Sequence, residues 1–171
     1  MSSPTSEHHH ELAAGRGPVA VAVVTVSDSR DAGSDANGDY LKARISAAGH
    51  TLAHYGAIAD EPAQVATSLE QAILADASVV VFNGGTGIAP RDRTYDVLDR
   101  LIERPIPGFG ELFRMLSWEQ VGSAAMLSRA SAGVCRGAVI FSLPGSPAAV
   151  RLGWERLIEP ELEHLVWQTE R

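Results

Sequence analysis

The feature that most restricts the fold is a series of short apolar runs, each ending in a polar or glycine-rich turn. The clearest are residues 19–26 (VAVAVVTV), 79–82 (VVVF) and 138–143 (AVIFSL). Short runs rich in β-branched residues are typical of strands buried on both faces of a parallel sheet. We therefore predict strands at these positions and a weaker strand at residues 51–58.

Segments with helical spacing alternate with these runs. The predicted helices cover residues 38–48, 61–75, 94–103, 110–116 and 119–129, and a last helix that begins at Pro147 and is kinked or divided at Pro160. Asp60 and Ser146 stand at N-cap positions, and residues 106–109 are predicted to be a rigid connection. Alternation of strands and helices predicts an α/β fold, doubly wound, with a mainly parallel sheet flanked by helices.

Length and composition predict one domain. A chain of 171 residues with 45% hydrophobic and 20% charged residues can bury a sizeable core. We expect a flexible tail at residues 1–17 and a single domain at residues 18–171. No apolar run approaches the roughly 20 residues of a membrane span, and the polar start is unlike a secretory signal, so we expect a cytoplasmic protein. The triplet His8-His9-His10 can bind a metal or simply be solvated.

The charge limits the possible ligands. A net charge of −7 argues against nucleic acid and membrane surfaces as partners. Lys42 is the only lysine among 14 basic residues. A bound phosphate would therefore be met by arginine, by backbone N–H groups or by a metal ion.

Three loops follow the predicted strands and are expected to share one edge of the sheet. They read TVSDS (25–29), NGGTGIAPRD (83–92) and LPGSP (143–147). In an open parallel sheet, ligands bind in the crevice at the carboxyl ends of the strands. The functional site is therefore predicted where these loops meet.

The turn Gly84-Gly85-Thr86-Gly87 has two interpretations. Consecutive glycines let backbone N–H groups converge into an anion-binding nest, to which Thr86 can add a hydroxyl, but they also occur in plain tight turns. The turn is neither a P-loop, which ends in Gly-Lys-Ser/Thr, nor a dinucleotide-binding G-x-G-x-x-G motif. Phosphate binding is favoured because residues 90–94 (PRDRT), a few positions after the turn, carry arginines immediately before a helix.

Two aspartates are candidates for metal binding. Asp92 can cap the helix that follows it, although Thr94 can serve as that cap instead, and Asp60 can likewise be only a cap. Magnesium is usually held by one or two carboxylates together with substrate phosphates. If both aspartates lie at the phosphate site, they predict Mg²⁺.

Five motifs in order resemble the molybdenum cofactor biosynthesis proteins of the MoaB/Mog family. They are TVSDSR (25–30), GGTGIAPRDRT (84–94), PGFGELFRMLS (107–117), LSRASAG (127–133) and LPGSP (143–147), and the likeness covers nearly everything after Val19. The phrases FRMLSWEQVG and AGH are more similar to the MoaB branch. One departure is Arg93, where many members carry an apolar residue.

The resemblance implies a molybdopterin adenylyltransferase, which joins AMP from ATP to the terminal phosphate of molybdopterin with the help of Mg²⁺. By that resemblance, Asp60 and Asp92 are the catalytic and metal-binding residues. Substrate binding is assigned to Ser27, Gly84, Gly85, Thr86, Gly87, Glu111, Ser128, Arg129, Gly145 and Ser146. Glu111 and Arg129 can equally form ion pairs within the chain.

The resemblance also implies a homo-oligomer, a trimer or hexamer, and contact with other proteins of the pathway. Trp118, Phe113 and Met115 are candidates for the subunit interface, although we expect them in the core. The main alternative function is a non-catalytic molybdopterin-binding or scaffold protein. A general Rossmann-type redox protein is disfavoured because the fingerprint glycines are missing.

Overall fold

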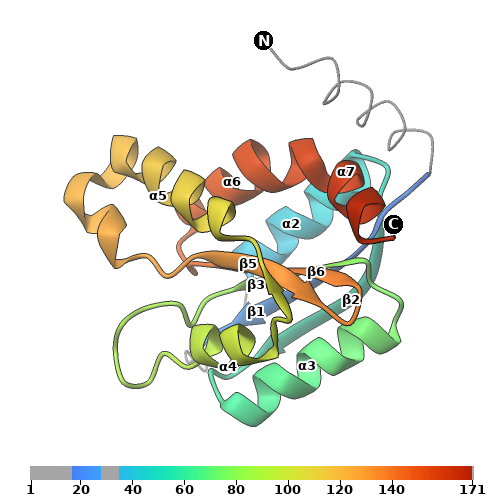
Figure 1. Ribbon diagram of the computed structural model, residues 1–171, viewed down its shortest axis with the longest axis horizontal. Helices are drawn as coiled ribbons and strands as arrows, with labels where there is room; N and C mark the ends of the chain where they lie inside the picture. The colour runs from blue at the N-terminus through green and yellow to red at the C-terminus, as the bar shows by residue number, and fades with distance from the viewer. Residues whose placement is uncertain (1–16, 28–34, 171) are drawn as a thin grey trace.

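The computed structural model describes residues 17–27 and 35–170. Within this part of the chain a six-stranded sheet forms the centre, in the order β2-β1-β3-β6-β5-β4. Strands β1 (Ala20–Val26), β2 (Thr51–Ile58), β3 (Val79–Asn83) and β6 (Ala138–Leu143) are parallel to one another. Helices cover both faces (Figure 1). The predicted α/β fold with a mainly parallel sheet is confirmed.

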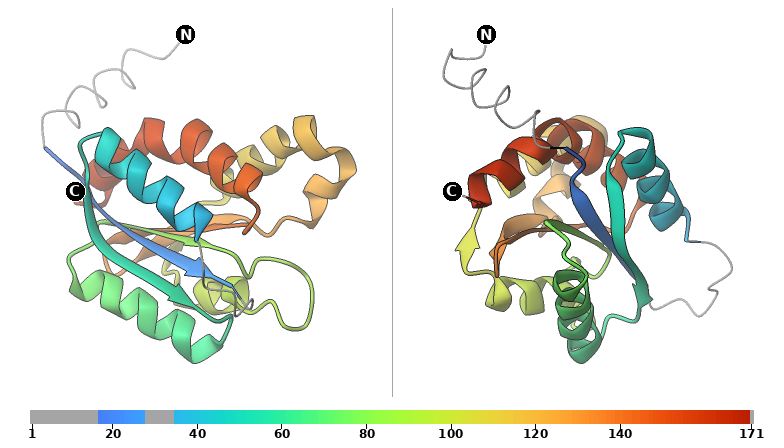
Figure 2. Two further views of the ribbon diagram at one scale, coloured as in Figure 1. Left: turned by 180° about the vertical axis from the view of Figure 1, so that it is seen from behind. Right: turned by 90° about the vertical axis from the view of Figure 1, so that its right-hand side faces the viewer.

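The helices divide into two layers. Helices α2 (Ala36–Ala47), α5 (Pro107–Val121), α6 (Pro147–Gly153) and α7 (Leu162–Thr169) lie on one face, and α3 (Pro62–Leu74) and α4 (Thr94–Leu101) lie on the other (Figures 1 and 2). Between α6 and α7 the chain forms a π-helical turn, η2 (Trp154–Ile158), and a 3-10 turn, η3 (Glu159–Glu161), which contains Pro160. The predicted division of the last helix at this proline is confirmed.

Strand β1 explains why the sheet needs both layers. Val21 and Val23 pack into the core beneath α2, α5 and η2, whereas Ala22 and Val24 pack into the core formed with α3 and α4. All four side chains are completely buried. A strand whose successive residues are all apolar can be stable only when both of its faces are covered.

The antiparallel edge of the sheet was not predicted. Strand β5 (Ser131–Cys135) pairs antiparallel with β6, and the short β4 (Arg104–Pro105) pairs with β5. The turn between β5 and β6 consists of Arg136 and Gly137, which have φ angles of 50° and 87°. Hairpin turns of this kind usually carry asparagine or aspartate before the glycine, and an arginine there conceals the signal.

Two further predictions in the middle of the chain are wrong. Residues 107–109 are not a rigid connection, because α5 begins at Pro107, a proline tolerated in the first helical turn. Residues 119–129 are not a helix of their own. Helix α5 runs on to Val121, Gly122 ends it with a φ of 59°, and a 3-10 segment, η1 (Gly122–Leu127), comes next.

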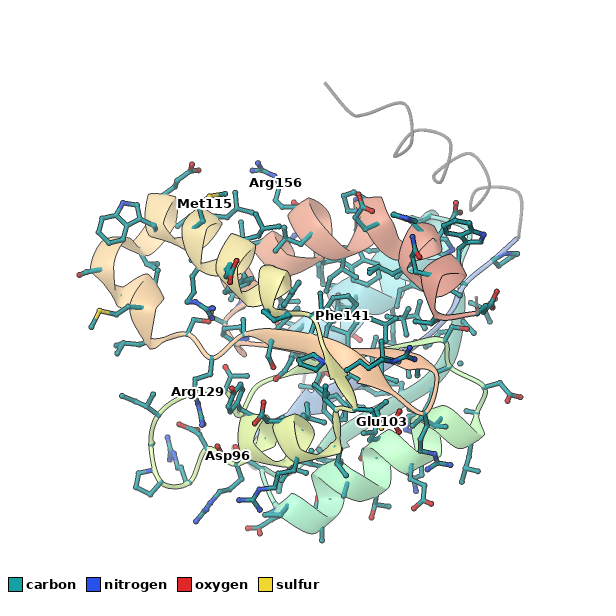
Figure 3. The ribbon with its side chains drawn as sticks, in the orientation of Figure 1. Asp96, Glu103, Met115, Arg129, Phe141 and Arg156 are labelled. Atoms are coloured by element: carbon teal, nitrogen blue, oxygen red, sulfur yellow. The ribbon has the colours of Figure 1, made fainter. Side chains whose placement is uncertain are left out.

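The expectation that three residues of α5 lie in the core is only partly right. Phe113 is buried, but Met115 and Trp118 are 60% and 62% exposed. Figure 3 shows Met115 pointing away from the sheet. No helix in residues 17–27 or 35–170 has the length and apolar character required to cross a bilayer.

Candidate functional site

A large cavity lies where the three predicted loops meet. It has a volume of about 740 Å³ and is bounded by the carboxyl ends of β1, β3 and β6, the loop before α4, and η1. Its lining residues are Val26, Ser27, Asp60, Gly84, Gly85, Thr86, Gly87, Arg91, Asp92, Ala124, Leu127, Ser128, Pro144 and Gly145. The prediction that these loops share one edge is confirmed for the described residues. Asp28 to Arg30 of the first motif lie outside them.

We call the side of the cavity at the carboxyl ends of β1, β3 and β6 the strand wall. It is held by a network of hydrogen bonds among Thr25, Asn37, Asn83 and Gly145. The Asn83 side chain is fully buried, and its amide donates to the Val24 carbonyl at 3.3 Å and to the Thr25 hydroxyl at 3.0 Å. The Asn37 amide donates to the Asn83 side-chain oxygen at 3.1 Å and to the Gly145 carbonyl at 2.8 Å. Sequence reasoning did not single out Asn83 or Asn37. The available signal was a polar residue ending the buried run 79–82.

Glycine is required at the start of the turn. Gly84 has a φ of 110° and Gly85 a φ of 65°, which is the left-handed region that side chains disfavour. A Cβ on Gly84 would collide with the Val26 carbonyl of the neighbouring strand. The Gly84 amide itself donates to the Leu143 carbonyl at 2.9 Å, which joins the end of β3 to β6, and Gly84 also lies against Val26 at the end of β1.

Asp60 does not cap the helix that follows it. The N-cap of α3 is Glu61, and no side chain caps that helix. The Asp60 carboxylate, 7% exposed, instead accepts from the Arg93 N–H at 3.0 Å and from the Thr94 hydroxyl at 2.8 Å. Thr94 is therefore not the cap of α4 either. The N-cap position is Arg93, and the anion at the start of α4 is supplied by Asp60 from a distant loop.

Asp92 lies in the same cavity and is partly exposed. One of its carboxylate oxygens, Oδ2, accepts from the Ala89 N–H at 3.0 Å, and its backbone N–H donates to the Ala89 carbonyl at 2.9 Å. Gly87 is in close contact with this carboxylate, and a Cβ there would collide with it. Asp92 is thus held by its own loop, while its Oδ1 accepts no hydrogen bond from the described residues.

Of the remaining predicted site residues, all but Ser146 line at least one of two cavities. Ser27 and Ser128 line the large one. Glu111, Arg129 and Ser128 line a neighbouring cavity of about 340 Å³ between α4, α5 and β5. Ser146 lines neither, and its hydroxyl accepts from the Ala149 N–H at 3.3 Å as the N-cap of α6, as predicted. Arg129 forms an ion pair with Asp96 at 2.9 Å.

Next to the strand wall, Asp35 caps α2 by accepting from the Gly38 N–H at 2.8 Å. Partial burial alone would raise the pKa of Asp35, but hydrogen bonds from Thr25, Gly38 and Tyr55 outweigh it, so the pKa lies below its ordinary value of 3.8. Burial and the hydrogen bond to Asp35 raise the pKa of Tyr55 to about 12. Tyr55 is therefore a stable donor at neutral pH.

The acidic residues of the large cavity are suited to a hard cation whose remaining coordination positions are filled by a bound ligand. Among the described residues no three His, Cys, Asp or Glu side chains gather into a metal-binding group. Among the residues that the structure describes, Asp60 and Asp92 are the carboxylates that line the cavity, and they lie against Gly85 and Gly87 of the glycine turn. Two carboxylates with space for substrate phosphates fit Mg²⁺ better than a metal enclosed entirely by protein.

Fold and cavity together define a class of protein: an α/β protein with a crevice at the carboxyl ends of parallel strands, formed by a glycine turn, an arginine and two carboxylates. The chain belongs to the family described as a probable molybdopterin binding domain, whose model matches residues 22–164.

Individual relatives agree with this family. The chain is 44% identical to the molybdenum cofactor biosynthesis protein B of Bacillus anthracis over 155 residues, which is 87% of this chain and 89% of the relative. It is 44% identical to the protein of that name from Staphylococcus aureus strain COL over 151 residues, 86% and 90% of the two chains. The solved structure of the tungsten cofactor synthesizing protein MoaB of Pyrococcus furiosus has a TM-score of 0.84 at 37% identity, covering 90% of this chain and 98% of that one. The resemblance to the MoaB branch is confirmed.

Proposed function

We propose that this protein acts in molybdenum cofactor biosynthesis by transferring AMP from ATP to the terminal phosphate of molybdopterin. The observation that carries the proposal is the large cavity, in which a glycine turn, Arg91 and two carboxylates surround space for a substrate. The family and the names of the relatives support the pathway and the pterin substrate.

The reaction requires positioning and charge stabilisation rather than a protein nucleophile. A phosphate oxygen of molybdopterin attacks the α-phosphorus of ATP, the new P–O bond forms, and the bond to the bridging oxygen breaks, so that pyrophosphate leaves with the electron pair. A phosphate monoester is largely ionised at neutral pH, so the step needs no base to generate the nucleophile.

Different residues of the cavity are assigned to substrate positioning and to charge stabilisation. The N–H groups of residues 85–87, the Thr86 hydroxyl and the Arg91 guanidinium are the donors available to phosphate oxygens, because the Gly84 N–H already donates to the Leu143 carbonyl. Ser27, Ser128 and Gly145 bound the rest of the cavity and are assigned to polar contacts with the pterin or its phosphate. Arg91 is exposed, and no other arginine or lysine among the described residues lines this cavity.

Two carboxylates alone would repel a triphosphate. Asp60 and Asp92 can therefore lie beside bound phosphates only if a cation lies between them. Bound Mg²⁺ would neutralise the phosphate charge in the transition state. Asp92 has the more accessible carboxylate. Asp60 can share a cation, but the hydrogen bonds to its two oxygens also make it the residue that fixes the start of α4.

The test is direct. Purified protein is incubated with molybdopterin, ATP and Mg²⁺, and pyrophosphate and adenylylated molybdopterin are measured. Failure to form either product would leave the non-catalytic binding protein as the better interpretation. Removing Mg²⁺ with a chelator should abolish turnover.

Asp92→Asn separates catalysis from binding. Loss of one electrostatic contact to the transition state should lower kcat by about 10²- to 10³-fold, with molybdopterin affinity changed only a few-fold. Asp76→Asn is the matched control, because Asp76 precedes β3 at the opposite end of the sheet. Equal losses of affinity and kcat in Asp92→Asn would contradict the role assigned to Asp92.

We further propose that the protein is a homo-oligomer, as its resemblance to the family implies, and that α5 and η1 take part in the interface. The large apolar side chains exposed there are Leu112, Met115, Trp118, Val121, Met126 and Leu127. An apolar surface of this kind is unusual for a monomer. Light scattering should give a multiple of the 18.1 kDa chain mass, and Trp118→Asp should reduce it.

A further inference from the structure

We infer that Arg129 is a positioning residue, which holds the loop of the active cavity and through it the carboxylate of Asp92. Residues 86–92 include four residues of the cavity lining, Thr86, Gly87, Arg91 and Asp92, and Arg129 contacts this segment from the neighbouring cavity. We call residues 86–96 together with Arg129 the loop wall. The catalytic consequence of this inference rests on the proposed function, whereas the contacts of Arg129 are independent of it.

The guanidinium of Arg129 contacts the loop at both of its ends. Its Nε donates to the Thr86 carbonyl at 3.2 Å, and one terminal nitrogen donates to the carbonyls of Gly87 and Asp92, the latter at 3.1 Å. Residues 86–87 begin the excursion from the glycine turn, and residue 92 ends it. One side chain therefore closes the loop.

Helix α4 fixes the guanidinium itself. The other terminal nitrogen pairs with Asp96 Oδ1 at 2.9 Å, and the guanidinium carbon lies 4.6 Å from the centre of the Tyr95 ring. Asp96 and Tyr95 belong to the first turn of α4, whose start is held by Asp60. Figure 3 shows Arg129 directed toward the loop and toward the helix that carries Asp96.

Only arginine can make this set of contacts. All three of its nitrogens are used, and they form a rigid planar fork with donors on several sides. Lysine keeps the charge, but its single ammonium group cannot reach the Thr86 and Asp92 carbonyls and the Asp96 carboxylate together. The guanidinium is occupied by protein acceptors, so substrate binding, the role that the family resemblance implies for Arg129, is less favoured than positioning.

Loss of the Arg129 contacts would affect catalysis through the position of the Asp92 carboxylate. Its carbonyl is held by Arg129, and its carboxylate accepts from the Ala89 N–H inside the closed loop. A loosened loop would let this carboxylate shift. A displacement of about 1 Å in a reacting site can cost about 10²-fold in rate.

The first test is hydrogen–deuterium exchange of the full-length protein without substrates. In Arg129→Lys, the hydrogen-bonded backbone amides of Ala89, Asp92 and Arg93 should exchange about tenfold faster than in the wild type, while those of β1 and β3 should not change. Arg100→Lys is the matched control, because Arg100 lies on the helix that carries Asp96, is exposed and lines neither cavity. Unchanged exchange at Ala89, Asp92 and Arg93 in Arg129→Lys would overturn the inference.

The second test divides binding from turnover. Arg129→Lys should lower kcat about 10- to 100-fold and leave KM for ATP within a few-fold. Asp96→Asn, which keeps the three bonds to main-chain carbonyls, should change exchange and kcat in the same direction but less. A rise in KM without a fall in kcat would show direct substrate contact and overturn the positioning role.

The two tests also separate this inference from the proposed function. If the wild type makes no product, the proposed function fails, and the exchange experiment still decides whether Arg129 holds the loop. If exchange rises in Arg129→Lys but kcat is unchanged in an active enzyme, the loop is held without catalytic need, and the positioning role is refuted.

Discussion

The two walls of the cavity are held in different ways. On the strand wall the side chain of Asn83 is fully buried, and its bonds tie β3 to β1 and, through Asn37, to the loop that follows β6. On the loop wall, residues 87–91 are exposed, and Arg129, more than thirty residues further along the chain, supplies the bonds that close the loop. The strand wall is part of the core, whereas the loop wall is attached to it. We therefore expect damage to the strand wall to reduce stability, and damage to the loop wall to reduce turnover.

The largest effect on stability is expected from Gly84→Ala. The new Cβ would collide with the Val26 carbonyl, and the φ of 110° is strained for alanine, so the free energy of unfolding should fall by about 3 kcal/mol. Urea unfolding followed by circular dichroism measures this. Gly108→Ala is the control, because a Cβ there meets nothing within 4 Å, and it should be neutral or slightly stabilising. Similar losses in both variants would contradict the argument.

Asn83→Ala should have the next largest effect. It removes the acceptor of the Asn37 amide and the donor to the Thr25 hydroxyl in a buried position, which should cost about 2 kcal/mol. The same unfolding measurement applies. A variant as stable as the wild type would show that the strand wall does not depend on this network. Thr67→Ala, an exposed substitution on α3, is the control.

Asp35→Ala should cost about 1 kcal/mol at neutral pH, because it removes the N-cap of α2. The pKa of Asp35 is lowered in the folded protein, so its carboxylate stabilises the fold above about pH 3.8, and this contribution disappears as the pH falls through the lower folded pKa. The difference between wild type and variant in unfolding experiments should therefore shrink below pH 3.8. A difference that grew with acidification would have the wrong sign. Glu70→Ala, an exposed substitution on α3, is the control.

The smallest effect on stability is expected on the loop wall. The Asp96 side chain is 44% exposed in its ion pair with Arg129, so Asp96→Asn should change the free energy of unfolding by less than about 0.5 kcal/mol. A loss as large as that of Asn83→Ala would remove the distinction between the walls. Thermal unfolding of the two variants side by side makes the comparison.

Much of the fold could be read from local patterns. The buried runs at residues 19–26 and 79–82, the glycine turn and the Ser146 cap depend on residues close in sequence, and the structure agrees with them. The edge strand β5 could not be read in this way, because SAGVC has little β-forming character and is stabilised by pairing with β6. The start of helix α5 was misjudged because a proline and two glycines are typical of a loop, although Pro107 suits a first turn.

The candidate site shows the same limit. Its glycines, Asp60 and Asp92 were recognised, but their hydrogen-bond partners were not. Asp60 stands directly before a helix, where capping α3 is the local expectation, yet it bonds to Arg93 and Thr94, more than thirty residues away. Nothing in the sequence between them indicates that contact. The ion pair of Arg129 with Asp96 was an open alternative, and its three bonds to loop carbonyls were unforeseen.

The sequence by itself determined the α/β class, the edge of the sheet that holds the site, and the glycine turn at its centre. These follow from periodicity, from β-branched runs and from the backbone freedom of glycine, which are properties of neighbouring residues. Only the tertiary structure decided which carboxylate fixes α4, that Asn83 and Asn37 support the strand wall, and that Arg129 closes the loop. Those contacts join segments far apart in the chain, and they exist only once the sheet brings the ends of β1, β3 and β6 together.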